Sequence, residues 1–186
     1  MKTLIINGSP RINGDTAALL SAFKAELRGD VKELSAYRDR ISPCLDCRYC
    51  TTHHACAISD DMDSVYKDDY DNLIIASPVY YGSLTGPMVS LASRLQTYHY
   101  LQPTPDSPRV LTPKRGALLL VGGGKANPKR AIGISNIIFR ILNVSLDESN
   151  ICLCFGTDVL PAKKNENAIK SAVALAARLN EKPPAI

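Results

Sequence analysis

The sequence predicts an α/β fold with a doubly wound, five-stranded parallel sheet. Short apolar runs rich in β-branched residues alternate along the chain with segments whose apolar residues recur at helical spacing. Such runs are typical of strands buried on both faces, and right-handed crossover helices place successive strands side by side. The chain has 186 residues and 45% hydrophobic content, enough for a substantial core, so we expect a single domain over residues 1–186.

The first two strand and helix units carry clear local signals. The run 3–6 ends at the turn signal Asn7-Gly8, and the next apolar residues keep helical spacing up to Gly29, which predicts a strand and then a helix. Residues 31–37 are the second expected strand. A cysteine-rich stretch without periodicity follows, and Ser59-Asp60-Asp61 supplies a cap and first-turn acids for a short helix that ends near Asp69.

The other three units follow the same pattern. The apolar run 73–76 predicts a strand, and a helix is expected over 86–98. Segment 101–114 contains four prolines and is expected to be an irregular connection. The runs 117–121 and 151–155 predict the last two strands, and the helices after them are expected over 132–142 and 169–179.

Composition and charge narrow the class of protein. Lysine and arginine number 22 against 18 acidic residues, a formal net charge of +4 without a run of five like charges. This weak bias fits an anionic cofactor better than a nucleic-acid partner. No stretch approaches the roughly 18 to 20 apolar residues that a membrane span needs, and the N-terminus leads straight into a strand. We therefore expect a soluble, cytoplasmic protein without a membrane or nucleic-acid partner.

Three loops are expected to form the ligand site. In open parallel sheets, ligands bind outside the carboxyl ends of the strands. The segments at those ends are 8–16, 77–83 and 122–127.

The first loop has the composition of an anion site. Between Gly8 and Thr16 it offers backbone N–H groups, two hydroxyls and the guanidinium of Arg11 at the start of a helix, which suits a phosphate dianion. A glycine-containing turn with a threonine cap is the alternative. Neither G-x-G-x-x-G nor G-x-x-x-x-G-K-[ST] is present, so a monophosphate is favoured over a dinucleotide or a P-loop ligand.

The same loop carries a family resemblance. Gly8, Ser9, Pro10, Arg11, Gly14 and Thr16 match the form G-S-P-R-x-x-G-x-[ST]. This resembles the NADPH-dependent FMN reductase and iron-sulfur flavoprotein group of flavodoxin-like proteins. The resemblance implies a flavodoxin-like sheet of order 2-1-3-4-5 and the cofactor FMN. It implies that the phosphate is bound by Ser9, Arg11, Asn13, Gly14, Asp15 and Thr16.

The second and third loops fit that resemblance. Segment 77–83 is similar to the family form S-P-[VI]-Y-x-G-x, which wraps the edge of the flavin ring; a plain turn with two partly exposed tyrosines is the alternative. The implied ring contacts are Pro78, Val79, Tyr80, Tyr81, Gly82, Ser83, Gly123 and Gly124. The following helix departs from the family form P-[ML]-K-x-[FL]-x-D-R. Val89 stands where lysine is common and Ser93 where aspartate is common, and only Arg94 is kept.

A cysteine cluster is the second strong signal. Cys44, Cys47, Cys50 and Cys56 fall in the loop 41–59. Four soft ligands joined by short spacers favour a 4Fe-4S cluster, and the iron-sulfur flavoproteins carry a compact motif of this spacing at this place. Redox-active or vestigial thiols are one alternative, and zinc is another, with His53 or His54 able to replace one cysteine. Cys152 and Cys154 alternate within a strand and are expected in the core.

Three functions are compatible with these features. The first is an FMN and cluster protein that transfers electrons between a carrier such as ferredoxin and a small-molecule acceptor. The second is a cluster-free NAD(P)H-dependent FMN or quinone reductase, and the third is a non-enzymatic flavodoxin-like carrier. No Ser-His-Asp set or carboxylate pair is evident, so we expect no acid-base catalytic residue. The family resemblance also implies a homodimer or homotetramer.

Overall fold

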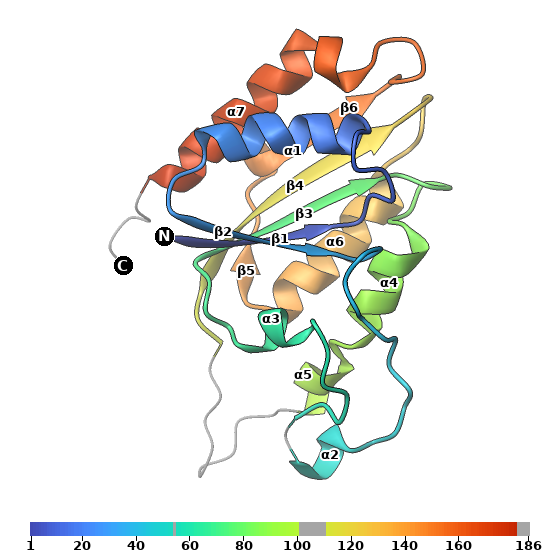
Figure 1. The fold of residues 1–186 in the computed structure, drawn as a ribbon, viewed down its shortest axis with the longest axis vertical. Helices are drawn as coiled ribbons and strands as arrows, with labels where there is room; N and C mark the ends of the chain where they lie inside the picture. The colour runs from blue at the N-terminus through green and yellow to red at the C-terminus, as the bar shows by residue number, and fades with distance from the viewer. Residues whose placement is uncertain (54, 101–110, 182–186) are drawn as a thin grey trace.

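The computed structural model describes residues 1–53, 55–100 and 111–181, in which helices cover both faces of one parallel sheet (Figure 1). The order β2-β1-β3-β4-β5, with β6 also paired to β4, confirms the predicted fold class. Both β5 and β6 pair along β4, β5 with its first residues and β6 with its second half, so together they form the fifth position. The strands are β1 (Lys2–Asn7), β2 (Asp30–Ser35), β3 (Asn72–Pro78), β4 (Lys114–Gly122), β5 (Val144–Ser145) and β6 (Ile151–Phe155).

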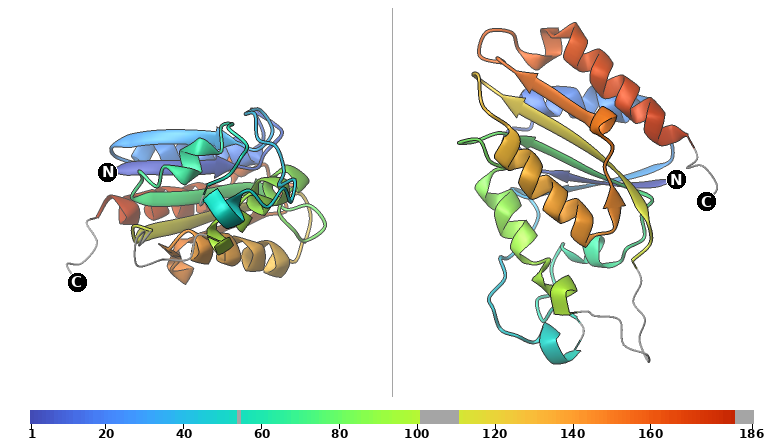
Figure 2. Two further views of the ribbon diagram at one scale, coloured as in Figure 1. Left: turned by 90° about the horizontal axis from the view of Figure 1, so that it is seen from below. Right: turned by 180° about the vertical axis from the view of Figure 1, so that it is seen from behind.

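The helices form two layers, one on each side of the sheet (Figure 2). On one side α1 (Asp15–Glu26) and α7 (Glu166–Asn180) pack on side chains such as Ile5 and Ile74. On the other side are α3 (Asp63–Tyr66), α4 (Gly86–Ser93) and α6 (Lys129–Ile141). These helices pack on the strand residues adjacent to Ile5 and Ile74, such as Leu4 and Ile75. Because successive strand side chains point to opposite faces, each fully apolar strand supplies both cores. Cys152 and Cys154 are buried in the α1 and α7 layer, as expected.

The expected helix over 86–98 is two helices, α4 and α5 (Gln96–Tyr100). The amides of Arg94 and Leu95 bond to the carbonyls of Leu91 and Ala92, three residues earlier, at 3.0 Å each. Such bonds tighten the backbone and end the regular helix. The break turns the side chain of Arg94 away from solvent, and it is buried.

The expected helix over 59–69 is also shorter, because only α3 is helical. The carboxylate of Asp60 accepts the amide of Met62 before the helix begins. At the other end Asp68 has a positive φ of 54°, which a continuing helix does not allow.

Two smaller differences concern β2 and the cysteine stretch. β2 ends at Ser35 and not near 37, because Ser35 accepts the amides of Arg38 and Asp39 in a turn. The cysteine stretch, in which no element was expected, contains the single helical turn α2 (Cys50–His53), too short to leave a periodic pattern. Residues 101–110 of the expected irregular segment lie outside the described residues. Among the described helices, none has the length and apolar character that a bilayer crossing requires.

Candidate functional site

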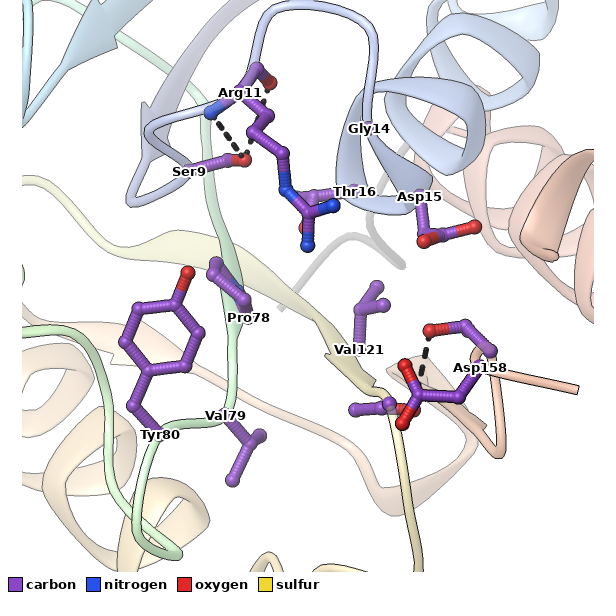
Figure 3. Close-up of a pocket in the computed structure, with 13 residues that line it drawn as sticks. Ser9, Arg11, Gly14, Asp15, Thr16, Pro78, Val79, Tyr80, Val121 and Asp158 are labelled. Carbon is purple, nitrogen blue, oxygen red and sulfur yellow. Dashed lines mark hydrogen bonds between the residues drawn. The ribbon is translucent and has the colours of Figure 1, made fainter.

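A pocket lies where β1, β3, β4 and β6 end (Figure 3). Its walls come from the three loops that the sequence identified and from the loop after β6. The lining residues are Ser9, Arg11, Gly14, Asp15, Thr16, Pro78, Val79, Tyr80, Val121, Gly122, Gly123, Thr157 and Asp158. The site therefore sits at the sheet edge where ligands of doubly wound folds bind.

The first wall is the loop between β1 and α1. The side-chain oxygen of Asn7 accepts the amide of Ser9 at 2.8 Å, and the Ser9 hydroxyl accepts the amide of Arg11 at 3.3 Å. The guanidinium of Arg11 extends into the pocket beside Thr16 (Figure 3). Helix α1 begins after Gly14 without a side-chain cap, so its first N–H groups are available to a ligand. This combination suits a phosphate dianion.

The start of α4 is packed tightly against this loop. The hydroxyl of Thr85 donates to the carbonyl of Gly8 at 3.0 Å. A Cβ on Gly8 would lie 2.3 Å from Cγ of Met88 and 2.9 Å from Oγ of Ser77. Only a glycine lets the loop approach β3 and α4 this closely. The loop between β1 and α1 and the start of α4 are thus one packed unit.

The second wall is a tight turn after β3. The backbones of Tyr80 and Ser83 bond to each other in both directions, at 3.0 and 2.9 Å. Tyr81 and Gly82 both have positive φ, 53° and 75°, as in a type I′ turn. The turn holds the Tyr80 ring at the side of the pocket (Figure 3), while the Tyr81 side chain is fully exposed. An aromatic side chain in this place can cover an apolar ligand surface.

The third wall joins the loops after β4 and β6. Gly122 accepts the amide of Thr157 and Gly123 accepts the amide of Asp158, both at 3.1 Å. A Cβ on Gly123 would lie 2.6 Å from the carboxylate oxygens of Asp158, so these loops touch at the glycine. Asp158 places a carboxylate in the same pocket as the Arg11 guanidinium.

The pocket contains most, but not all, of the residues that the sequence suggested. Asn13, Tyr81, Gly82, Ser83 and Gly124 are not among its lining residues. Asn13 and Gly124 are exposed, and the 80–83 turn points Tyr81 outward.

Asp15 lines the pocket, but its carboxylate has another task. One of its oxygens accepts the amide of Ala162 at 2.7 Å and so ties α1 to the chain after β6. Asp15 is therefore fixed by the fold before any ligand binds.

Three lining residues lie outside the segments identified from the sequence: Val121, Thr157 and Asp158. Gly122 begins the expected segment 122–127, although it was not among the implied ring contacts. Thr157 and Asp158 follow the strand expected over 151–155. The rule that ligands bind at carboxyl ends applies to this loop as well, and it was the signal that could have found them.

A second pocket contains all four cysteines of the loop 41–59. Cys44, Cys47, Cys50 and Cys56 line it together with Arg94 from the end of α4. All six cysteines of the chain are free thiols. Within the described ranges no three His, Cys, Asp or Glu side chains are grouped around a single-ion site. A four-iron cluster has a separate cysteine on each iron, so its ligands surround a larger body and need not meet at one point.

The histidines of the cysteine loop have different places. His53 is exposed and its ring stacks on Tyr49, with 3.8 Å between the centroids. His54 lies outside the described residues. The stack occupies one face of the His53 ring.

Arg94 shapes the electrostatics of the second pocket. Burial raises the pKa of the Cys50 thiol, and the other cysteines add to this effect. Burial also acts to raise the pKa of Cys56, but the amide of Ile58 and the charge of Arg94 outweigh it, so that pKa lies below its ordinary value. The Arg94 side of the pocket therefore favours an anionic sulfur.

Helix α4 separates the two pockets, which have no lining residue in common. Thr85, just before α4, bonds to the β1–α1 loop, whereas Ser93 and Arg94 at the end of α4 contact the cysteine loop. An eight-residue helix is about 12 Å long. The loop that carries α2 lies with α5 below the sheet, away from the β1–α1 loop (Figures 1 and 2).

Comparisons with known proteins agree with this arrangement. An iron-sulfur flavoprotein of Archaeoglobus fulgidus is 27% identical over 186 residues, covering 97% of this chain and 80% of the relative. An iron-sulfur flavoprotein of Methanocaldococcus jannaschii is 34% identical over 130 residues, 67% of this chain and 63% of the relative.

Similarity in structure extends over nearly the whole chain. The NAD(P)H:quinone oxidoreductase of Methanothermobacter marburgensis superposes with a TM-score of 0.69, at 14% identity and over 98% of both chains. At this identity the likeness concerns the fold. The family model of NADPH-dependent FMN reductases matches residues 1–146, which include the first two walls, the loop after β4 and the whole cysteine loop. The chain therefore belongs to the NADPH-dependent FMN reductase family and is an FMN-binding redox protein.

Proposed function

We propose that this protein transfers electrons between a carrier such as ferredoxin and a small-molecule acceptor, through FMN in the first pocket and a 4Fe-4S cluster on the cysteine loop. The observation that carries the proposal is that four free cysteines line one pocket of a chain in which a second pocket, at the strand ends, has the lining expected of a phosphate site. The relatives in Archaeoglobus and Methanocaldococcus, both called iron-sulfur flavoproteins, support it.

The chain's own residues would bind and orient the flavin. Arg11, Thr16 and the uncapped start of α1 are available to the phosphate. Val79 and Tyr80 offer apolar surface to the ring, and the packed glycines let backbone approach it. Bound FMN accepts a hydride or an electron pair and returns electrons singly. The protein contributes placement and electrostatics, for which no acid-base pair is needed.

The cysteine loop fits a cluster in its donor set and its surroundings. Four cysteine sulfurs are the usual ligands of a 4Fe-4S cluster. The pocket that they line also contains the buried cation of Arg94, which suits an anionic iron-sulfur centre. Zinc and uncomplexed redox thiols are the competing occupants, and metal analysis distinguishes them.

Titration with the two kinds of donor tests the direction of electron flow. Under anaerobic conditions, we expect reduced ferredoxin to bleach the flavin absorbance within seconds, with NADPH much slower. Rapid bleaching by NADPH together with no reaction with ferredoxin would overturn the proposed donor.

A cluster-free NAD(P)H-dependent FMN or quinone reductase is the second candidate. The family match over residues 1–146 favours it, because that family is named for the NADPH-dependent reduction of FMN. Anaerobically prepared protein that contains no iron, and that oxidises NADPH when a quinone is added, would favour this function over the first.

A further inference from the structure

The end of α4 holds the cysteine loop on both sides of its cysteines. The hydroxyl of Ser93 accepts the amide of Cys44 at 3.0 Å. The two terminal nitrogens of Arg94 donate to the carbonyls of Ser42 and Ile58, at 3.0 Å each. Ser42 precedes the first cysteine and Ile58 follows the fourth. One arginine therefore closes the loop at its two ends.

Arg94 is a buried cation and not a surface cation. Its side chain is 0% exposed and pairs with the carboxylate of Asp60 at 2.7 Å. The same Asp60 oxygen accepts the amide of Ser42 at 3.0 Å. The ring of Tyr66 lies 5.8 Å from the guanidinium carbon. Because arginine stays protonated, the charge is permanent.

One hydrogen-bond donor of Arg94, the Nε–H group, is unpaired within the described ranges. This group is also buried. Buried donors are almost always paired, so an orphan in a pocket wall indicates an acceptor that the pocket is made to hold. The pocket in whose wall Arg94 lies is the one lined by the four cysteines.

We propose that Arg94 is the positioning residue of the cluster site, which closes the cysteine loop on α4 and offers Nε–H and a permanent positive charge to an anionic sulfur centre. The inference rests on the proposed function, because it assigns Arg94 a role at the cluster, and the proposed function requires that cluster. Hydrogen bonds to cluster sulfurs and nearby positive charge raise the reduction potential of iron-sulfur centres. Arg94 therefore sets the potential of the cluster as well as its place.

Three variants separate these roles. Arg94→Gln loses the positive charge and the planar guanidinium, whose two terminal nitrogens bond to both ends of the loop. In this variant we expect at least a twofold loss of iron per chain with FMN retained. In the cluster that remains, the ratio of reduced to oxidised form at a fixed potential should fall about tenfold, which for a one-electron couple is about 59 mV. Ser93→Ala removes a loop contact but no charge. It should lower iron content slightly and leave the potential unchanged.

Arg94→Lys keeps the charge but not the planar fork, so we expect less iron than in the wild type and a potential closer to the wild type than that of Arg94→Gln. If Arg94→Gln also loses FMN, Arg94→Lys decides. Lost iron with FMN retained supports the positioning role. Full iron content and an unchanged potential in both arginine variants would overturn the proposal.

Hydrogen exchange of the metal-free protein tests the anchoring of the cysteine loop by Arg94 independently of the proposed function. In protein prepared with a chelator, the amides of 42–60 should exchange faster in Arg94→Gln than in the wild type, while β1 and β3 are unchanged. If the wild type binds no iron, the proposed function fails but the anchoring contact can still be seen. Equal exchange in both proteins would contradict the anchor itself.

Discussion

The two pockets of this molecule are built in opposite ways. The pocket proposed for FMN, called the flavin pocket below, lies at the ends of four strands, and its walls are joined by backbone bonds and by glycines packed against neighbouring side chains. The cysteine loop has a single turn of helix, and Ser93, Arg94 and Asp60 attach it to the fold. The first site is formed by the sheet before any ligand binds. The second depends on a few side chains and on what its cysteines bind.

This difference predicts that each site can be damaged without the other. The pockets share no lining residue, and α4 lies between them. Changes in the glycine-packed walls should affect FMN and spare iron, whereas changes in the loop should do the reverse.

The largest effect is expected from Cys47→Ser. A hydroxyl is a poor ligand for iron in place of a thiolate, so we expect nearly complete loss of iron and sulfide with FMN per chain unchanged. Metal analysis and flavin absorbance of the same anaerobic preparation check both. Cys152→Ala, which changes a buried cysteine of the core, is the control and should keep its iron. Loss of FMN together with iron would break the separation of the two regions.

Gly8→Ala should be the most damaging small change in the flavin pocket. Its Cβ would meet Met88 at 2.3 Å, and such overpacking costs about 1–3 kcal/mol. We expect a lower midpoint of thermal unfolding and weaker FMN binding, measured by calorimetry and flavin fluorescence. Gly133→Ala in α6 is the matched control, because its Cβ would meet nothing within 4 Å. Equal effects of both variants would argue against the close packing as the cause.

Arg11→Ala should weaken FMN binding without unfolding the protein. Removing one charged donor to a phosphate costs about 1.5–3 kcal/mol, or roughly a tenfold to hundredfold rise in Kd. Titration of the apoprotein with FMN measures it. Arg28→Ala, an exposed arginine just beyond the other end of α1, makes the same change in net charge and should leave Kd unaltered. Unchanged FMN affinity in Arg11→Ala would remove Arg11 from the phosphate site.

The smallest effect is a pH dependence of the cysteine loop. Burial acts to raise the pKa of Asp60, but hydrogen bonds from Arg94 and from the amides of Ser42 and Met62 outweigh it and hold the pKa below its ordinary value. A carboxyl with a lowered pKa stabilises the fold above the ordinary value of about 3.9, and this stability is lost as the pH falls through the folded value.

The comparison between wild type and Asp60→Asn tests this sign. The difference in their free energies of unfolding should be largest above about pH 4 and should shrink toward pH 3. Urea unfolding at a series of pH values measures it. A difference that stays constant from pH 6 to pH 3 would mean that the Asp60 ion pair does not contribute to stability.

The sequence allowed the meeting of three loops in one pocket to be predicted, because the signals for these loops are local. The run that ends at Asn7-Gly8 and the loop up to Thr16 stand next to each other in the chain, and so do β3 and the 77–83 turn. The rule for doubly wound sheets then brings these loops together. The 80–83 turn was recognised, but its positive φ at Tyr81, which points that side chain outward, has no signal in a single sequence.

The cysteine region shows where sequence reasoning ends. The spacing of the four cysteines indicates their chemistry. Their geometry, however, depends on Arg94, which bonds to residues 34 to 52 positions away. Helical periodicity depends on residues close together in the sequence and does not indicate such long-range contacts. It therefore predicted one continuous helix through Arg94. The break that turns Arg94 inward follows from these tertiary contacts.

Counting FMN and iron per chain in protein prepared without oxygen distinguishes a protein with two redox centres from a flavoprotein without a cluster. We expect one FMN and about four irons with matching acid-labile sulfide for each chain, and no zinc. Full FMN occupancy with zinc, or with neither iron nor sulfide, would contradict this expectation.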